Sequence, residues 1–161
     1  MSIRVFVTGG TFDKTYDEIH GALHFGETSL PNMLEMGRCR LNLKVETLMM
    51  IDSLEMDEEQ RNRIVERCGA APESHIVVTH GTDTMVQTAA ALAEHVSGKT
   101  IVLTGAMIPI AFGSSDGLFN LGGALSVVQV LPPGVYVAMN GRVFEWDKVR
   151  KNRKTGVFEP L

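Results

Sequence analysis

The chain has 161 residues, 44% hydrophobic and 21% charged, a composition typical of one folded domain with its own core. A net charge of −4 gives no electrostatic basis for nucleic-acid binding, although residues 148–154 are locally basic. No apolar stretch reaches the roughly 18 residues of a membrane span, and a strand pattern stands where a secretory signal would be apolar. We therefore expect a single-domain, cytoplasmic protein that binds neither nucleic acid nor membrane.

The first expected strand covers residues 3–7 and ends in Thr8-Gly9-Gly10-Thr11. The two glycines allow the backbone to approach a ligand closely, although a simple strand-ending turn would look the same. NAD binding is excluded, because a dinucleotide fingerprint needs a third glycine followed directly by a helix. Residues 12–29 read as a long loop or loose hairpin, a length typical of lids. Its candidate functional residues, each also typical of a solvated loop, are Lys14, Tyr16, His20 and His24.

A short helix is expected over residues 31–40, because its proline suits a first helical turn. Residues 43–50 predict the second strand, and Asp52 and Ser53 follow where it ends. These two side chains could equally be turn formers. A capping-box pattern then predicts a helix over residues 57–69.

The densest polar cluster follows the apolar run at residues 76–78, in the segment THGTDT at residues 79–84. A helix is expected to begin directly afterwards, over residues 85–95. The first backbone N–H groups of such a helix lack partners and favour anions and oxyanions. Thr82 and Asp83 therefore lie at a position suited to chemistry. The alternative, which this segment by itself favours, is that one of them simply caps the helix.

The rest of the chain is expected to contain, in order, a strand at 100–103, a loop at 108–114, a helix at 118–130, a strand at 135–139, a hairpin at Asn140-Gly141 into 142–144, and a basic, polar tail. Alternating strands and helices predict an α/β fold: a doubly wound, mostly parallel sheet with helices on both faces, over residues 1–161. Ligands bind beyond the carboxyl ends of the strands in such sheets. This rule places at one edge Thr11, Ser53, Thr82, Asp83 and Ala106.

Hydroxyls, an acid and a lysine favour acyl transfer through a hydroxyl nucleophile. A lysine can act as the base when burial or a nearby positive charge lowers its pKa, and a carboxylate can orient it. His80 is interpreted as structural, because one intervening residue does not aim its imidazole at Thr82. Cys39 and Cys68 lack metal-site spacing and are interpreted as packing residues, so no metal site is expected.

Five motifs resemble those of bacterial-type L-asparaginases, in the order and spacing of that family's amino-terminal domain, from residue 3 to about 155. They are TGGTF at 8–12, DSLEM at 52–56, THGTDTM at 79–85, GAM at 105–107 and SDGLFNL at 115–121. THGTDTM is the most specific of them. The resemblance implies hydrolysis of L-asparagine to L-aspartate and ammonia, with some glutamine turnover, and without metal or organic cofactor.

The resemblance also assigns the catalytic roles. Thr11 matches the nucleophile, and Tyr16 matches the lid tyrosine that assists it. Thr82, Asp83 and Lys151 match a Thr–Lys–Asp relay, in which Asp83 also holds the substrate's α-ammonium. Thr82, beside the acid and the lysine, is the rival nucleophile.

The implied substrate-binding residues come from the same motifs. Ser53, with Asp52 beside it, matches the element that receives the α-carboxylate. Ala106 matches a backbone contact to the leaving amide. Gly10 and Gly81, in the two glycine turns, complete the implied binding set.

Family members continue into a smaller carboxyl-terminal domain that lends groups to a neighbouring subunit's site, whereas this chain ends at Leu161. We therefore expect a short form that lacks this domain, in which Asp17, Glu18 or His20 could replace the missing groups. The resemblance further implies a homo-oligomer, either a dimer or a tetramer.

Two other functions stay open. A glutaminase or other aspartyl-amide hydrolase would differ by about one methylene in the substrate, worth about 1–3 kcal/mol. A sensor could keep the amino-acid pocket without turnover. The presence of Thr11, Thr82, Asp83 and Lys151 together favours catalysis over sensing.

Overall fold

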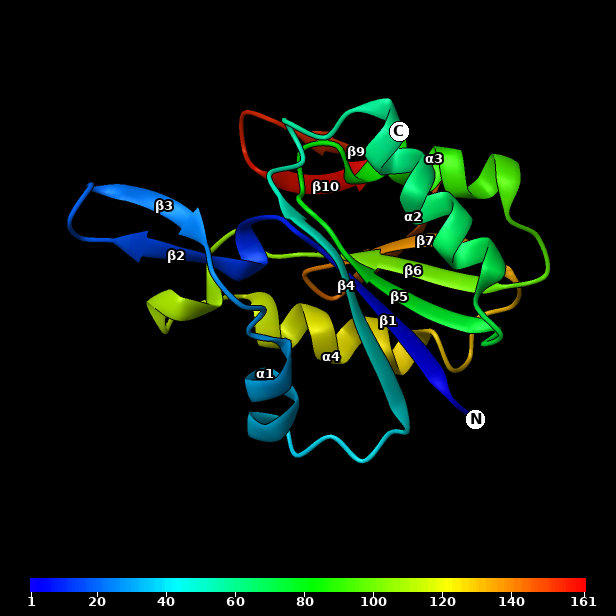
Figure 1. Cartoon of the computed structure of the whole chain (residues 1–161). Helices are drawn as coiled ribbons and strands as arrows, with labels where there is room; N and C mark the ends of the chain where they lie inside the picture. Colours follow the sequence, from blue (N-terminus) through cyan, green and yellow to red (C-terminus); the bar gives the residue numbers. More distant parts are fainter.

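The computed structural model describes residues 1–161 as a central sheet with helices on both faces (Figure 1). The elements are β1 (Ile3–Gly9), η1 (Thr11–Asp13), β2 (Lys14–Asp17), β3 (Ala22–Phe25), α1 (Leu30–Met36), β4 (Leu43–Ile51), α2 (Glu58–Ala70), β5 (His75–Thr79), α3 (Met85–His95), β6 (Thr100–Thr104), η2 (Ile110–Phe112), α4 (Gly117–Val127), β7 (Gly134–Met139), β8 (Arg142–Glu145), β9 (Val149–Asn152) and β10 (Val157–Pro160).

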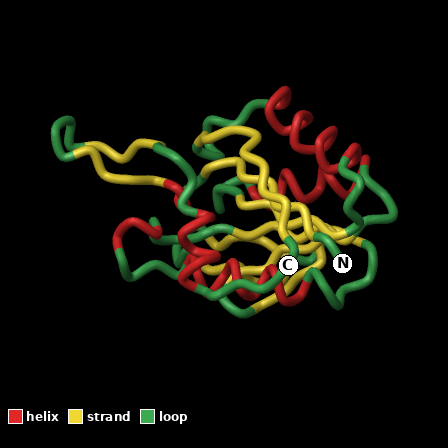
Figure 2. Tube along the Cα trace, turned by 60° about the horizontal axis from the view of Figure 1, so that its bottom comes forward, coloured by secondary structure: helices red, strands yellow, loops and turns green.

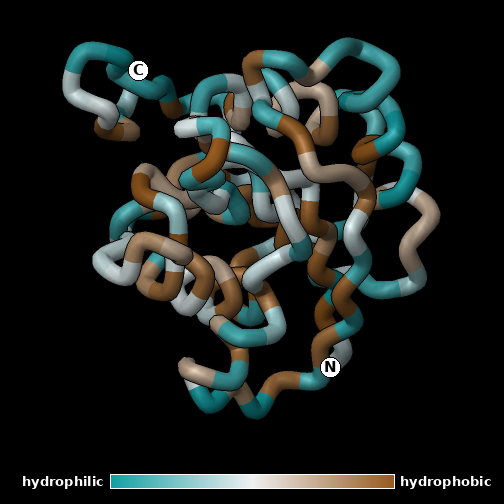
Figure 3. Tube along the Cα trace, turned by 60° about the vertical axis from the view of Figure 1, so that its left-hand side comes forward, coloured by the Kyte–Doolittle hydropathy of each residue, from teal (hydrophilic) through white to brown (hydrophobic).

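The main sheet has the strand order β4-β1-β5-β6-β7-β8. Neighbouring strands from β4 to β7 run parallel, and β8 adds an antiparallel edge. Its central strands are apolar runs because both of their faces are buried, as in other parallel sheets. β1 is coloured as hydrophobic along most of its length (Figure 3). The predicted doubly wound α/β fold is confirmed.

Two apolar cores cover the two faces of the sheet. One unites Phe6 and Ile76 with Ile64 of α2 and Leu92 of α3. The other unites strand residues with Met33 of α1 and with Leu121, Ala124 and Leu125 of α4. Figure 1 shows α2 and α3 on one side of the sheet and α1 and α4 on the other. None of the helices is long and apolar enough to cross a membrane.

Two local sequence signals produced the structures that they predicted. Asp57 accepts a hydrogen bond from the Gln60 N–H at 2.8 Å, and its own N–H donates to Gln60 Oε1 at 3.0 Å, which completes the capping box of α2. Asn140 and Gly141 have φ angles of 52° and 82°, as a two-residue hairpin with a primed turn requires. This hairpin joins β7 to β8.

The segment at residues 12–29 is more regular than a long loop. It follows η1 with the antiparallel hairpin β2–β3, which agrees with the hairpin alternative and projects from the body of the protein (Figure 2). The helix predicted over residues 31–40 ends at Met36 with Gly37 as its C-cap, because Arg38, with a φ of 50°, leaves the helical path. η2 lies within the predicted loop at residues 108–114.

The predicted basic tail is wrong. Residues 149–160 form the antiparallel hairpin β9–β10, and its apolar residues Val149 and Phe158 are buried in the core beneath α3. Alternate residues of a strand face the same side, so burial of Val149 turns Lys151 inward as well. Two consecutive charged residues, Arg150 and Lys151, hide this short strand pattern in the sequence.

The strand order creates a topological switch point beside β1. The chain leaves β1 for the outer strand β4 and returns to β5 on the opposite side of β1. The connections after β1 and β5 therefore diverge at the carboxyl ends of these two strands, which is the position where ligands bind in open α/β sheets.

Candidate active site

Three backbone segments meet at the switch point. Gly10, which follows β1, donates its N–H to the Ile51 carbonyl at the end of β4, at 2.9 Å. A Cβ at Gly10 would lie 2.5 Å from the Cα of Gly81, which follows β5. Gly10 also has a φ of 80°, so glycine is required both for space and for conformation. Thr11, half-buried, begins directly after this contact.

The end of β4 is joined to the start of α3. A Cβ at Gly81 would lie 2.5 Å from the hydroxyl oxygen of Ser53. This hydroxyl accepts the Thr84 N–H at 3.3 Å, and Thr84 Oγ1 donates to the Ser53 carbonyl at 2.9 Å. Thr84 occupies the N-cap position of α3. The Thr82 and Asp83 side chains therefore remain available for other contacts, and the capping interpretation of these two residues is wrong.

Lys151, which lies near the end of the chain, contacts the side chains of both Thr82 and Asp83. Its ammonium group donates to Thr82 Oγ1 at 2.7 Å and to Asp83 Oδ1 at 2.8 Å. The Lys151 side chain is only 10% exposed, and Thr82 is buried. The hydroxyl, amine and carboxylate thus form one partly desolvated cluster, in which their interactions are stronger than in bulk water.

A second ion pair lies at the same edge, between Lys14 and Asp52. Burial raises the pKa of Asp52, but hydrogen bonds from Lys14 and Leu54 and the charges of Lys14 and Lys151 outweigh burial and lower this pKa overall. The sequence pointed to Lys14 only as one of several lid residues. It is the first residue of β2, three positions after Thr11, and only the fold brings it to Asp52.

The loop after β6 borders Thr82. A Cβ at Gly105 would collide with the His80 carbonyl and lie 3.5 Å from Thr82 Cγ2. Asn120 of α4 donates to the Gly105 carbonyl at 2.8 Å, and the Asp116 carboxylate accepts the Met107 N–H at 3.0 Å. Ala106, between these anchors, is buried. The SDGLFNL segment therefore positions this loop.

His80 is fully buried and lies in a directional chain of hydrogen bonds. Arg61 donates to Thr88 Oγ1 at 2.6 Å, and Thr88 lies 2.8 Å from His80 Nε2. His80 Nδ1 lies 2.8 Å from the Gly81 carbonyl, which can only accept, so Nδ1 carries the proton and Nε2 accepts from Thr88. Burial lowers the pKa of His80 to about 4. This arrangement supports the structural role predicted for His80.

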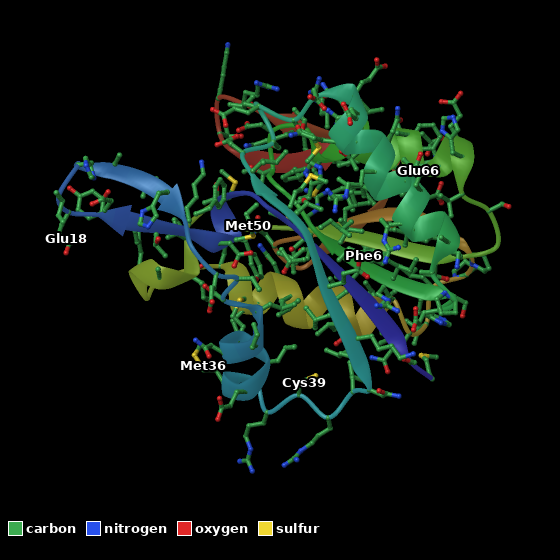
Figure 4. All side chains as sticks on the ribbon, in the orientation of Figure 1. Phe6, Glu18, Met36, Cys39, Met50 and Glu66 are labelled. Atoms are coloured by element: carbon green, nitrogen blue, oxygen red, sulfur yellow. The ribbon has the colours of Figure 1, made fainter.

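Several predicted residues lie elsewhere. Tyr16 is 55% exposed on β2, and its hydroxyl lies 3.9 Å from where a Cβ of Gly21 would stand, near the hairpin turn. Glu18 stands at the far end of the same hairpin (Figure 4). Asp17 and His20 pair with each other there. The structure therefore does not bring Tyr16 or the three proposed substitute residues to Lys151.

The two cysteines have the environments expected of packing residues. Cys68 is buried in α2, and burial raises the pKa of its thiol to about 12, whereas Cys39 is half-buried. No group of three or more histidine, cysteine, aspartate or glutamate side chains is placed to hold a metal ion.

Comparison with known proteins identifies the family. The family model described as "Asparaginase, N-terminal" matches residues 2–158. A curated relative from Haemophilus influenzae, "Probable L-asparaginase periplasmic", is 33% identical over 166 residues, which cover 97% of this chain and 48% of the relative. A component of the glutamyl-tRNA(Gln) amidotransferase from Methanococcus vannielii is 33% identical over 157 residues, covering 88% of this chain and 35% of that relative.

A solved structure agrees with these matches. The thermostable L-asparaginase from Thermococcus kodakarensis superimposes with a TM-score of 0.85 at 28% identity, over 100% of this chain and 51% of that one. The chain spans about half the length of these L-asparaginase relatives. The chain therefore belongs to the asparaginase family and corresponds to its amino-terminal portion.

Proposed function

We propose that this protein is an L-asparaginase-type amidohydrolase, which converts L-asparagine and water to L-aspartate and ammonia through a threonine nucleophile. The observation that carries the proposal is the contact of Lys151 Nζ with both Thr82 Oγ1 and Asp83 Oδ1 at the switch point. A hydroxyl, an amine and an orienting carboxylate in mutual hydrogen-bond reach are the parts of an activated nucleophile. Family membership supports the same reaction class.

The chemistry would proceed in two steps. The threonine oxygen attacks the side-chain amide carbon, and Lys151, when its amine is deprotonated, accepts the hydroxyl proton. The carbon–nitrogen bond then breaks, and ammonia leaves with a proton. Water next attacks the resulting aspartyl ester, which releases L-aspartate and restores the threonine. Backbone N–H groups at the glycine turns and at the start of α3 suit the developing oxyanion.

Thr11 and Thr82 remain rival nucleophiles. Thr82 has the direct contact with Lys151, whereas Thr11 follows the turn at Gly10 that packs against Gly81. Acid quenching during turnover of L-asparagine, followed by peptide mapping, would locate the aspartyl ester on one of these two residues. The other threonine would then be assigned to proton transfer or to polarising the amide.

Ammonia release from L-asparagine tests the proposed activity. We expect Thr11→Ala and Thr82→Ala each to lose at least about 100-fold in kcat, because general acid–base and nucleophilic groups contribute on this scale. Thr155→Ala, an exposed threonine in the β9–β10 turn, is the matched control and should keep full activity. Activity that survives both site substitutions, in variants with unchanged circular dichroism, would contradict the proposal.

A longer amide substrate is the second candidate, since one relative is named for a glutamyl-tRNA(Gln) amidotransferase. Comparing kcat/KM for L-asparagine and L-glutamine decides between the two side chains. Binding of L-asparagine without ammonia release would instead indicate the sensor function.

Three further parts of this proposal are catalysis without metal or organic cofactor, an oligomeric state of dimer or tetramer, and a cytoplasmic location. The Haemophilus influenzae relative is named periplasmic, so fractionation is the test of location.

A further inference from the structure

The Lys14–Asp52 ion pair carries an inference about which amides the site accepts, and this inference rests on the proposed function. Lys14 is the first residue of the β2–β3 hairpin, and Asp52 directly follows β4, so the pair joins the hairpin to the carboxyl end of β4 beside the switch point. The Lys14 side chain is 19% exposed and that of Asp52 is 28% exposed. Both charges are therefore partly desolvated but reachable from solvent.

The hydrogen bonds of the pair leave Lys14 with donors to spare. Asp52 uses Oδ2 for Lys14 and Oδ1 for the Leu54 N–H at 2.9 Å, so its carboxylate is held in place from both sides. An ammonium group has three N–H donors, and Asp52 is the only hydrogen-bond acceptor that Lys14 contacts. Lys14 is thus a fixed cation that can accept a further anionic partner.

Lys151 is more fully engaged than Lys14. Two of its three N–H donors already go to Thr82 and Asp83. The Arg153 guanidinium, exposed on the β9–β10 hairpin, donates to the Asp83 carbonyl at 3.3 Å. Of the two buried-edge lysines, Lys14 therefore keeps more free donors, and its partner Asp52 is next to Ser53 in the chain.

The charges beside the switch point also suit one kind of ligand. Two lysines and two aspartates pair as Lys14–Asp52 and Lys151–Asp83, and the positive charge of Lys151 also acts on Asp52. Alternating positive and negative groups match a zwitterion, whose carboxylate and ammonium need opposite partners. A substrate with a blocked carboxyl would offer no carboxylate to the remaining N–H donors of Lys14, and a polar group left unpaired in this way disfavours the ligand.

We propose that Lys14 binds the substrate's α-carboxylate and restricts this site to amides of free α-amino acids, against amino acids whose α-carboxyl is esterified or amide-linked. Ser53, on the adjacent position of the chain, would share the carboxylate. Under this assignment an aminoacyl ester of tRNA, which has no α-carboxylate, is a poor substrate. The alternative role of the ion pair is to tether the hairpin to β4 without contacting substrate.

The test compares L-asparagine with its α-N-methylamide, from which only the side-chain amide releases ammonia. We expect Lys14→Met to lower kcat/KM for L-asparagine by about 10- to 100-fold, mainly through KM, as loss of a charge-assisted hydrogen bond predicts. The low kcat/KM for the α-N-methylamide should not change. Lys14→Arg should restore the preference for L-asparagine. Lys148→Met, which removes an exposed ion-paired lysine outside the site, is the matched control.

Two results would overturn the inference: an equal loss of kcat/KM for both substrates, which indicates a tether, or no loss for either. Calorimetric binding of L-aspartate and its α-N-methylamide separates this inference from the proposed function. If the wild type binds L-aspartate but releases no ammonia from L-asparagine, the proposed hydrolytic function is refuted. Weaker L-aspartate binding by Lys14→Met would still support the role of Lys14 in binding the α-carboxylate. Unchanged binding by the variant, or no L-aspartate binding by the wild type, would overturn it.

Discussion

The buried His80 makes the stability of this protein fall as the solution becomes acidic. In the folded state burial lowers the pKa of His80 to about 4, against an ordinary value of 6.5. Below pH 6.5 the unfolded chain takes up a proton at this position, while the folded protein does not until the pH nears 4. The unfolded state binds more protons throughout this window, so the free energy of unfolding falls with falling pH.

The size of the effect follows from the shift in pKa. Each unit corresponds to about 1.4 kcal/mol, so the full window is worth about 3 kcal/mol, and the part between pH 6.5 and pH 5 is worth about 2 kcal/mol. Protonation would also break the hydrogen-bond chain, because Nε2 would then become a donor facing Thr88. Arg61 already donates to that hydroxyl, and its positive charge further opposes a second cation nearby.

Urea unfolding of the wild type and of His80→Gln, at about pH 7.5 and about pH 5, measures this contribution. Glutamine can still accept from Thr88 and donate to the Gly81 carbonyl, but it does not titrate. We expect the wild type to lose about 2 kcal/mol more than His80→Gln between the two pH values. His95→Gln, an exposed histidine on α3, should lose as much as the wild type. Equal losses in the wild type and in His80→Gln would refute the reasoning.

Four further predictions concern activity and stability. Lys151→Met should lower kcat for ammonia release by at least about 100-fold, whereas Lys148→Met should not. Gly81→Ala should destabilise the fold by about 1–3 kcal/mol in urea unfolding and abolish turnover, because its Cβ would lie 2.5 Å from a serine hydroxyl. Asp57→Ala should cost about 1 kcal/mol in the same assay by removing the cap of α2. Burial raises the pKa of Glu73, but its ion pairs outweigh burial and lower this pKa to about 2. The ionised Glu73 therefore stabilises the folded protein above pH 4.5, and this contribution to the free energy of unfolding should be lost as the pH falls from 4.5 towards 2. Glu73→Gln should remove this part of the pH dependence of stability.

Local patterns in the sequence were enough to predict most of the elements and the sheet edge at which the candidate residues lie. Strand and helix patterns are local, and so are the capping box at Asp57 and the Asn140-Gly141 turn, because each depends on residues a few positions apart. Alternation of strands and helices then predicts a parallel sheet, whose carboxyl ends carry the polar turns. Thr11, Ser53 and Thr82 are therefore placed at one edge before any contact is known.

Which of these groups touch depends on the packing of whole elements. Lys151 contacts Thr82 across 69 positions of the chain, and Lys14 contacts Asp52 across 38. The first contact depends on the hairpin β9–β10, whose short mixed pattern resembles a polar tail until burial of Val149 turns its alternate residues inward. Tyr16 shows the opposite case, because the hairpin that carries it projects away from the body. Contacts between distant segments are set by tertiary packing, and local patterns do not contain that information.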